Sequence, residues 1–519
     1  MDLIKKSVHI NNMRGKSESQ ITLDDDVNVP DKYPDINTLI TKSGNIEIDT
    51  VKISKNKINV KGKLNFSIMY KAESDKENAV SVQKLDGTIN FDEIINMDGI
   101  EEGDSVGVDL KIDDLSITVV NSRKISVKAL IDAIAIAENI RDEDFSTGIN
   151  NDDVMYIKDT ISLTQIAVKK KDLLRVKEDI NLVSGKLNIN EIIWSTKTLT
   201  QSNVKLSDDK INISGEIAVF VLYSSDDGPL QWTNATVPFN GDIAVEGCTE
   251  EMIPNISLKL NSCQIEAKPD YDGEPRILSF DGIISVDVKL YEEQQFEIVK
   301  DAYSRDKDLV LDTKKTDFEN ILMKNIVKCR VSEKIKQDNK IDDSHVMQIC
   351  NCTGDIKIDE TRIEEDGIGV EGAIDVNVLY ICSDDSSPIC CLSDSIPFSQ
   401  KIDINGMNPD CVYQINATPE QINSNMSGTD EVEVKATVSL DCIAFEKLSA
   451  DVVQDIEEKD YDYDKIAKMP GIVAYVCKDG DTLWSIAKKF YSTADSIKEI
   501  NDIKGEVAKD QMIVVAKKM

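Results

Sequence analysis

The chain has 519 residues, which at the usual ~100–200 residues per domain is room for about three to five domains. Its net charge of −35 and pI near 4.5 argue against nucleic acid and anionic membrane surfaces as partners. Apolar residues make up 41% of the chain and aromatic residues only 5%, so we expect cores of Ile, Val and Leu.

Three segments repeat one pattern, in which a glycine is followed eight positions later by a tyrosine within a run of alternating apolar and polar residues. These pairs are Gly62 and Tyr70, Gly215 and Tyr223, and Gly372 and Tyr380, with glycine spacings of 153 and 157 residues. A second landmark, a phenylalanine eight residues before a glycine, follows in each segment. These pairs are Phe91 and Gly99, Phe239 and Gly247, and Phe398 and Gly406.

The alternation is that of half-buried β-strands, and a glycine inside a strand indicates a bulge or a close approach of two backbones. The sequence therefore predicts a mainly β protein with three tandem antiparallel repeats, each a β-sandwich or barrel. We place them at residues 1–165, 166–318 and 319–450. An acidic, turn-rich stretch at 451–470, ending in Pro470, predicts a linker.

Residues 471–519 form a separate small domain. A strand at 472–477 is followed by a turn, a helix that Asp481 or Thr482 can cap, a second helix at 493–500 and a return strand at 512–515. The predicted order is β-α-α-β.

Catalytic and metal signatures are missing from the sequence. The two histidines, His9 and His345, have no visible nucleophile partner, and neither phosphate-binding glycine motif occurs. Zinc is disfavoured because no C-x₂-C pair is present. We expect no catalytic residues, no metal and no cofactor, and rank a hydrolase hidden among the 95 carboxylates far behind other functions.

Cysteine usage and hydropathy bear on the compartment. Eleven cysteines, an odd number that includes the adjacent Cys390 and Cys391, favour a reducing compartment over a disulfide framework. The chain has no apolar run of signal-peptide length at its start and no run long enough to cross a membrane, so we expect no membrane span.

The run from Gly480 to Ala487, Gly-Asp-Thr-Leu-Trp-Ser-Ile-Ala, resembles the LysM domain, a small module known for binding N-acetylglucosamine polymers. The resemblance implies a ligand groove between the loop after the first strand and the loop after the second helix. Trp484 either stacks on a partner or completes the core. Two positions depart from the family: Cys477 replaces a β-branched residue, and Lys509-Asp510-Gln511 stands where Pro-Gly-Gln is usual. The implied groove residues are Asp479, Gly480, Asp481, Thr482 and Leu483 on one side and Asn501, Asp502, Ile503 and Lys504 on the other.

A triplicated acidic β body that ends in one LysM domain resembles a family of clostridial spore-coat morphogenetic proteins. The resemblance implies a non-enzymatic adaptor in the mother-cell cytoplasm, at the forespore surface and spore coat. It would dock through the LysM domain to the coat-basement ATPase SpoIVA, with other coat proteins as further candidate partners. We expect Ile472 and the stretch from Asp481 to Trp484 to carry that contact. The alternative is a protein that binds N-acetylglucosamine polymers of peptidoglycan or cortex in the same groove.

Overall fold

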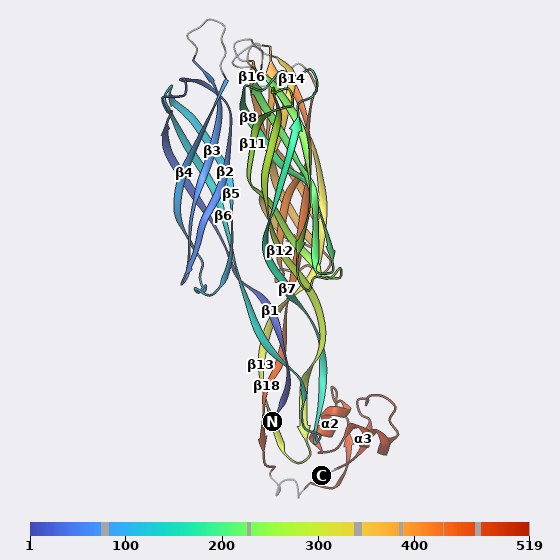
Figure 1. Cartoon of the computed structure of the whole chain (residues 1–519). Coiled ribbons are helices and arrows are strands. Elements are labelled where there is room, and N and C mark those ends of the chain that lie inside the picture. Colours follow the sequence, from blue (N-terminus) through green and yellow to red (C-terminus); the bar gives the residue numbers. More distant parts are fainter. Residues whose placement is uncertain are drawn as a thin grey trace.

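The computed structural model gives an elongated molecule, with β domains at one end, a long stalk, and a small, partly helical domain at the other end (Figure 1). It describes residues 1–73, 82–225, 230–336, 345–383, 388–428, 430–461 and 469–517.

The three predicted copies are present, and each contributes six strands among the described residues. The first copy contains β1 (Leu3–Asn28), β2 (Ile36–Ser54), β3 (Lys57–Ala72), β4 (Val82–Asn96), β5 (Ser105–Asn121) and β6 (Lys124–Ile149). The second contains β7 (Val154–Asn181), β8 (Glu191–Ser207), β9 (Lys210–Ser224), β10 (Gln231–Ala244), β11 (Ile253–Pro269) and β12 (Pro275–Ser304). The third contains β13 (Asp308–Lys336), β14 (Val346–Glu364), β15 (Gly367–Cys382), β16 (Ile389–Asp403), β17 (Val412–Met426) and β18 (Glu431–Lys459).

Each copy is an antiparallel sandwich. In the first, the sheet β2-β3-β4 packs against β1-β6-β5, and side chains from both sheets form one core. The second and third copies repeat this with β8-β9-β10 on β7-β12-β11, and with β14-β15-β16 on β13-β18-β17. The predicted fold class is confirmed. The predicted domain limits at 165 and 318 fall inside β7 and β13, whereas the chain turns between copies at 150–153 and 305–307.

The strand glycines mark a close approach, and the two sequence landmarks meet there. Gly215 pairs directly with Phe239 across β9 and β10, and Gly62 and Gly372 pair with Phe91 and Phe398 in the same way. A Cβ on Gly215 would lie 2.6 Å from the Phe239 ring and also collide with a backbone oxygen of β8. Only glycine leaves room for the ring.

The stalk arises because one pair of strands in each copy is far longer than the others. β1 with β6, β7 with β12, and β13 with β18 continue beyond the sandwiches as two-stranded ribbons (Figure 1). Equivalent apolar residues of the three ribbons meet in one core, for example Ile10, Leu163 and Phe318. Each ribbon also has a bulge at the equivalent position, at Thr147, Lys300 and Gln454.

The sandwiches meet in the same manner. Met69, Leu222 and Leu379 each precede the landmark tyrosine, and they share one cluster between the copies. Equivalent residues therefore pack together as they would around an approximate threefold axis. We call the three sandwiches the head and the three ribbons the stalk.

The linker prediction is wrong for residues 451–459. These residues continue β18 and pair with β13, because Val452, Val453 and Ile456 supply buried side chains to the stalk core. Residues 462–468 of the predicted linker lie outside the described residues.

The terminal domain has the predicted β-α-α-β order. It contains β19 (Ile472–Val476), α2 (Leu483–Lys489), α3 (Ala494–Asn501) and β20 (Met512–Ala516). The two strands pair antiparallel, and both helices pack on one side of them around a core that includes Leu483, Ile486 and Ile497.

Candidate functional site

The first predicted groove loop is held by a network around Asp481. The carboxylate accepts hydrogen bonds from the backbone N–H of Lys478 at 2.7 Å and from the Tyr475 hydroxyl at 2.8 Å. These bonds, the backbone one first, lower the pKa of Asp481. Gly480 takes φ +84°, which suits glycine. Thr482 then caps α2 in a reciprocal capping box with Ser485, so the loop is rigid.

The second predicted groove loop is fixed by Asn501, the last residue of α3. Its side-chain amide donates to the carbonyls of Ile497 and Val514, at 2.8 and 2.7 Å. Its amide oxygen accepts from the Val514 N–H at 2.7 Å. Asp502 follows in a left-handed conformation with φ +51°, which ends the helix. The loop is thereby tied to β20.

The predicted site residues differ in how far they reach solvent. Leu483 is only 3% exposed and belongs to the core, so it supports the loop and does not line a groove. The partly buried members are Asp481, Trp484, Asn501 and Ile503, and the exposed members are Ile472, Asp479, Gly480, Thr482, Asp502 and Lys504.

Trp484 packs against the protein's own stalk. Its ring makes an edge contact with Tyr303, with the ring centroids 4.8 Å apart, and its indole N–H donates to Asp301 at 2.8 Å. Of the two roles expected from the sequence, the packing role is the one visible in the free chain. Neither stalk residue carries a sequence signal that would have pointed to this contact.

The segment Lys509-Asp510-Gln511, which stands where the family usually has Pro-Gly-Gln, forms a turn between α3 and β20. Asp510 adopts φ +64°, in the region that glycine favours. Its N–H donates to the carbonyl of Cys477 at 2.9 Å, and the Cys477 N–H donates to Gln511 at 2.9 Å. The turn therefore still closes the two strands.

The outer face of the two-stranded sheet is apolar, which the sequence analysis missed apart from Ile472. Inward residues such as Tyr475 and Ile513 pack on the helices, while the alternate residues point away from them. The sequence does indicate this face, because both strands are apolar at every position and so small a domain cannot bury both faces of its sheet. We call this surface the apolar sheet face: Ile472, Ala474, Val476, Met512, Val514 and Ala516.

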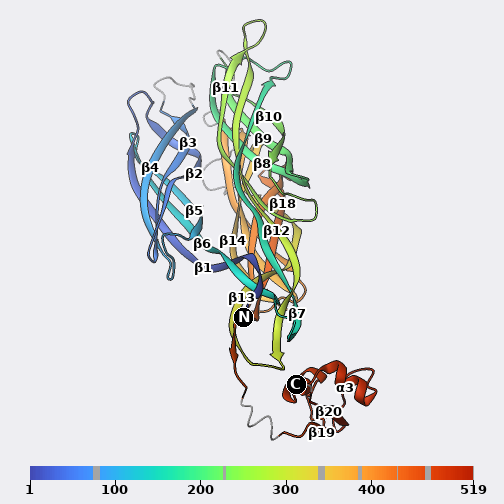
Figure 2. The same ribbon diagram turned by 60° about the horizontal axis from the view of Figure 1, so that its bottom comes forward.

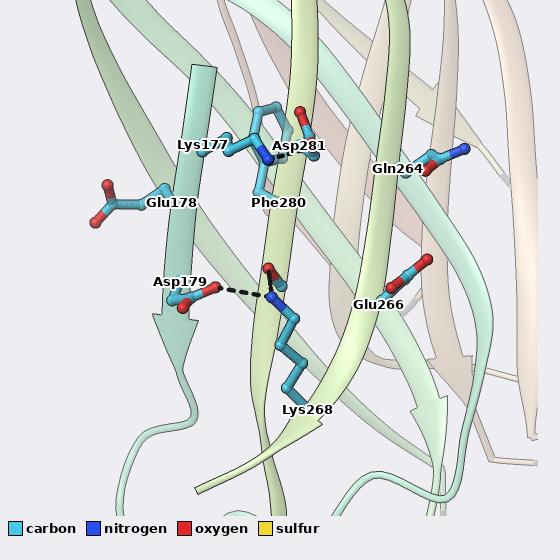
Figure 3. Close-up of a pocket in the computed structure, with 9 residues that line it drawn as sticks. Lys177, Glu178, Asp179, Gln264, Glu266, Lys268, Phe280 and Asp281 are labelled. Atoms are coloured by element: carbon cyan, nitrogen blue, oxygen red, sulfur yellow. Dashed lines mark hydrogen bonds and ion pairs between the residues drawn. The ribbon is translucent and has the colours of Figure 1, made fainter. Parts of the chain in front are cut away.

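The head offers a pocket between β7, β11 and β12 (Figure 3). Several of its charged groups are paired: Asp281 contacts Lys177 at 3.0 Å, and Lys268 lies 3.9 Å from Asp179. Asp281 also contacts Arg175, outside the lining, at 2.9 Å. The cations lower the pKa of Asp281, with the hydrogen bond from Arg175 as the main cause. Histidine and cysteine are missing from the lining. The arrangement is a set of paired charges along exposed strands.

Other chemistry finds little support in the described residues. His9 contacts Asp142 and His345 contacts Asp430 at 2.7 Å, both on exposed surface. Within the described ranges, no group of three or more His, Cys, Asp or Glu side chains is placed to hold a metal ion. In the same ranges no helix combines the length and the apolar character needed to cross a membrane.

Comparison with protein families gives two matches. The model of the SipL, SPOCS domain matches residues 35–120, 188–268 and 345–427, and the LysM domain model matches 475–508. Each SPOCS match covers the β2–β5 strands of the head or their counterparts and leaves the stalk ribbons out. Comparison with curated proteins and with solved structures gave no match. SPOCS and LysM domains are non-catalytic binding or adaptor modules, and the chain belongs to the SipL family of sporulation proteins, with three SPOCS domains followed by a LysM domain.

Proposed function

We propose that this protein is a non-enzymatic adaptor of spore-coat assembly, acting in the mother cell at the forespore surface. Its LysM domain docks to a SpoIVA-like coat-basement ATPase and so helps the coat encase the forespore. The observation that carries the proposal is the apolar sheet face. Its side chains are strongly exposed, Ile472 at 69% and Met512 at 71%.

Such a face is costly to leave in water. Fully burying one aliphatic side chain is worth ~1.5–3 kcal/mol, and contiguous exposed apolar surface commonly marks a protein interface. Val476 at 47% and Val514 at 38% extend the face across both strands. The face is therefore suited to a protein partner with an apolar surface.

Charge supports the choice of this domain for docking. The whole chain carries −35, whereas residues from Gly471 onward contain eight lysines and seven acidic residues. The acidic body repels other acidic surfaces at long range. The LysM domain has nearly balanced charge and can approach acidic surfaces, which favours this domain as the contact region.

The test is binding of purified SpoIVA to the full chain, measured by calorimetry. Ile472→Asp should weaken binding by about 30-fold or more, as expected for a central apolar anchor worth ~2 kcal/mol. The matched control is Leu173→Asp, which changes an equally exposed aliphatic residue on β7 (64% exposed) and should leave binding intact. Equal affinities for the two variants, with unchanged circular dichroism, would refute the docking surface.

Binding of N-acetylglucosamine polymers is the second candidate function. The ordered Asp481 network and the exposed backbone at Gly480 favour it, because they keep the family's loop in place. Titration of the full chain with N-acetylglucosamine oligomers tests it. Heat that disappears in Thr482→Ala and persists in Ile472→Asp would assign a glycan site to the groove.

A further inference from the structure

We propose that the tip of the second stalk ribbon is a docking surface for the chain's own LysM domain, which holds helix α2 in a fixed orientation. The contact joins Asp301 and Tyr303 on β12 to Trp484 and Lys488 on α2, and we call these four residues the tail clamp. It stands whether or not the apolar sheet face binds a coat protein.

Asp301 is the centre of the tail clamp. One carboxylate oxygen accepts from the Trp484 indole N–H at 2.8 Å, and the other accepts from the Lys488 ammonium at 2.6 Å. The two donors are four residues apart, so they lie on one face of the helix. A carboxylate is well matched to two such donors, and its charge strengthens both bonds.

Tyr303 provides the apolar part of the contact. It is only 4% exposed and belongs to the same core cluster as Leu483 and Ile486 of the LysM domain. Its hydroxyl donates to the backbone carbonyl of Ser492 at 2.9 Å. Burial of the Tyr303 side chain raises the pKa of its hydroxyl to about 12.

A second contact lies next to the tail clamp. The ring of Tyr461, just after β18, makes an edge contact with Tyr491 of the LysM domain at 5.0 Å. The Tyr461 hydroxyl donates to the carbonyl of Ser304 at 2.6 Å. The chain leading to the LysM domain is therefore also fixed to the end of β12.

Comparison of the three ribbons shows that this surface is particular to the second one. The shared bulges align Asp301 and Tyr303 with Gly148 and Asn150 in the first ribbon, and with Asp455 and Glu457 in the third. Neither equivalent pair offers an aromatic ring. A carboxylate beside an aromatic ring thus occurs in the ribbon that carries the tail clamp and in neither equivalent pair, which indicates a specific surface.

The tail clamp also determines which face the LysM domain presents. The clamp engages α2, whereas the apolar sheet face lies on the side of β19 and β20 that points away from the helices. Figure 2 shows α3, β19 and β20 at the end of the molecule opposite to the head. The stalk therefore presents the apolar sheet face outward, far from the head.

The test is ¹⁹F NMR of the full chain labelled with 5-fluorotryptophan. The protein has three tryptophans, and Trp484→Phe assigns the resonance of interest. A clamped Trp484 should give a line as broad as those of Trp194 and Trp232 in the head. Asp301→Lys should shift and narrow that line, because the released domain tumbles faster than the body.

The equivalent change in the third ribbon, Asp455→Lys, is the matched control. Asp455 accepts the N–H of the next residue, Ile456, as Asp301 accepts that of Ala302, so local effects should be alike. This variant should leave the Trp484 line unchanged. The head tryptophans report within the same spectrum that the body remains folded.

Zero-length carbodiimide cross-linking gives an independent readout. Peptide mapping of the wild-type chain should find Lys488 joined to Asp301, and the product should be lost in Asp301→Asn. A narrow Trp484 line in the wild type, or a line that Asp301→Lys does not change, would overturn the proposal. Ile472→Asp should weaken partner binding without shifting or narrowing the Trp484 resonance. The experiments therefore distinguish a failure of the tail clamp proposal from a failure of the docking proposal.

Discussion

The head and the tip of the stalk share an approximate threefold symmetry, but they differ in whether equivalent positions carry the same residue. In the head, equivalent positions carry the same residues, such as Gly62, Gly215 and Gly372. At the tip, the equivalents Asn150, Tyr303 and Glu457 have diverged. Repeated residues serve packing that all three copies need, whereas a residue that differs marks a place where one copy meets something that the others do not. The predictions that follow alter one kind of position or the other.

The largest effect is expected from breaking a repeated position. Gly215→Val places a branched side chain where a Cβ alone would meet the Phe239 ring at 2.6 Å and the β8 backbone. Relief requires moving both neighbouring strands, so we expect a loss of about 4 kcal/mol or more in the free energy of unfolding. Urea unfolding followed by circular dichroism measures it.

The control is Gly107→Ala on β5, where a Cβ meets no atom within 4 Å. It should change stability by less than ~0.5 kcal/mol. Similar losses for both variants would show that glycine at position 215 matters for its backbone freedom and not for the space beneath Phe239.

Glu138 is a position where the first copy has diverged. Its equivalents, Tyr291 and Phe445, stack edge to face at 5.5 Å, while the buried Glu138 carboxylate binds Lys169 at 2.8 Å and Lys289 at 2.5 Å. Glu138→Gln should cost about 2–3 kcal/mol in unfolding free energy, since it leaves two partly buried ammonium groups without their counter-charge.

The same carboxylate predicts a pH dependence. Burial acts to raise the pKa of Glu138, but the attraction of Lys289 and the hydrogen bonds of both lysines outweigh it, so the pKa falls below its ordinary value of 4.5. Its stabilisation is therefore present above pH 4.5 and is lost as the pH falls through the lower, folded-state value. Glu138→Gln should flatten this part of the stability profile. If Glu138→Gln left the low-pH part of the stability profile unchanged, the loss of stability in acid would belong to other carboxylates.

A smaller effect is expected at a position where asparagine in one copy and aspartate in another accept the equivalent hydrogen bond. Asn56, Asp209 and Asp366 immediately precede β3, β9 and β15 and have φ between +54° and +59°. The Asp209 side chain accepts the N–H of Gly247 at 2.8 Å, and that of Asn56 accepts the N–H of Gly99 at the same distance. Asp209→Ala should cost about 1–2 kcal/mol in unfolding free energy.

Asp209→Asn should be nearly neutral, because the first copy already uses asparagine for this bond. Parallel urea titrations of the two variants make the comparison. If the asparagine variant lost as much as the alanine variant, the charge of Asp209 and not its hydrogen bond would be the stabilising feature.

The head could be predicted from sequence because its rules are local. The strand glycines and the landmark phenylalanines appear at fixed spacings, and they turn out to be cross-strand partners, Gly215 with Phe239 for example. Alternation likewise predicted the strands and an antiparallel β class, and it left the choice between sandwich and barrel open. The LysM domain was equally accessible, since its caps at Thr482 and Thr493 are short-range features.

The stalk and the tail clamp could not be predicted, because both depend on contacts between distant segments. The stretch after Ala450 looked like an acidic linker, and only pairing with β13 makes its Val452 and Ile456 into core residues. Trp484 meets Asp301 across 183 residues. A lone Asp next to a strand-end Tyr carries no periodicity that could signal a partner so far away.

The smallest effect is expected in the LysM domain, at the turn where Asp510 stands in place of the family's glycine. A non-glycine residue at φ +64° is strained, so Asp510→Gly should stabilise the turn by about 0.5–1 kcal/mol. Hydrogen exchange of the Asp510 and Cys477 amides in the full chain measures local opening, and both should exchange more slowly. The neighbouring Lys509→Gly adds freedom to the unfolded chain without relieving a positive φ, and it should speed exchange. Faster exchange in both variants would mean that the Asp510 side chain stabilises the turn more than its backbone strain weakens it.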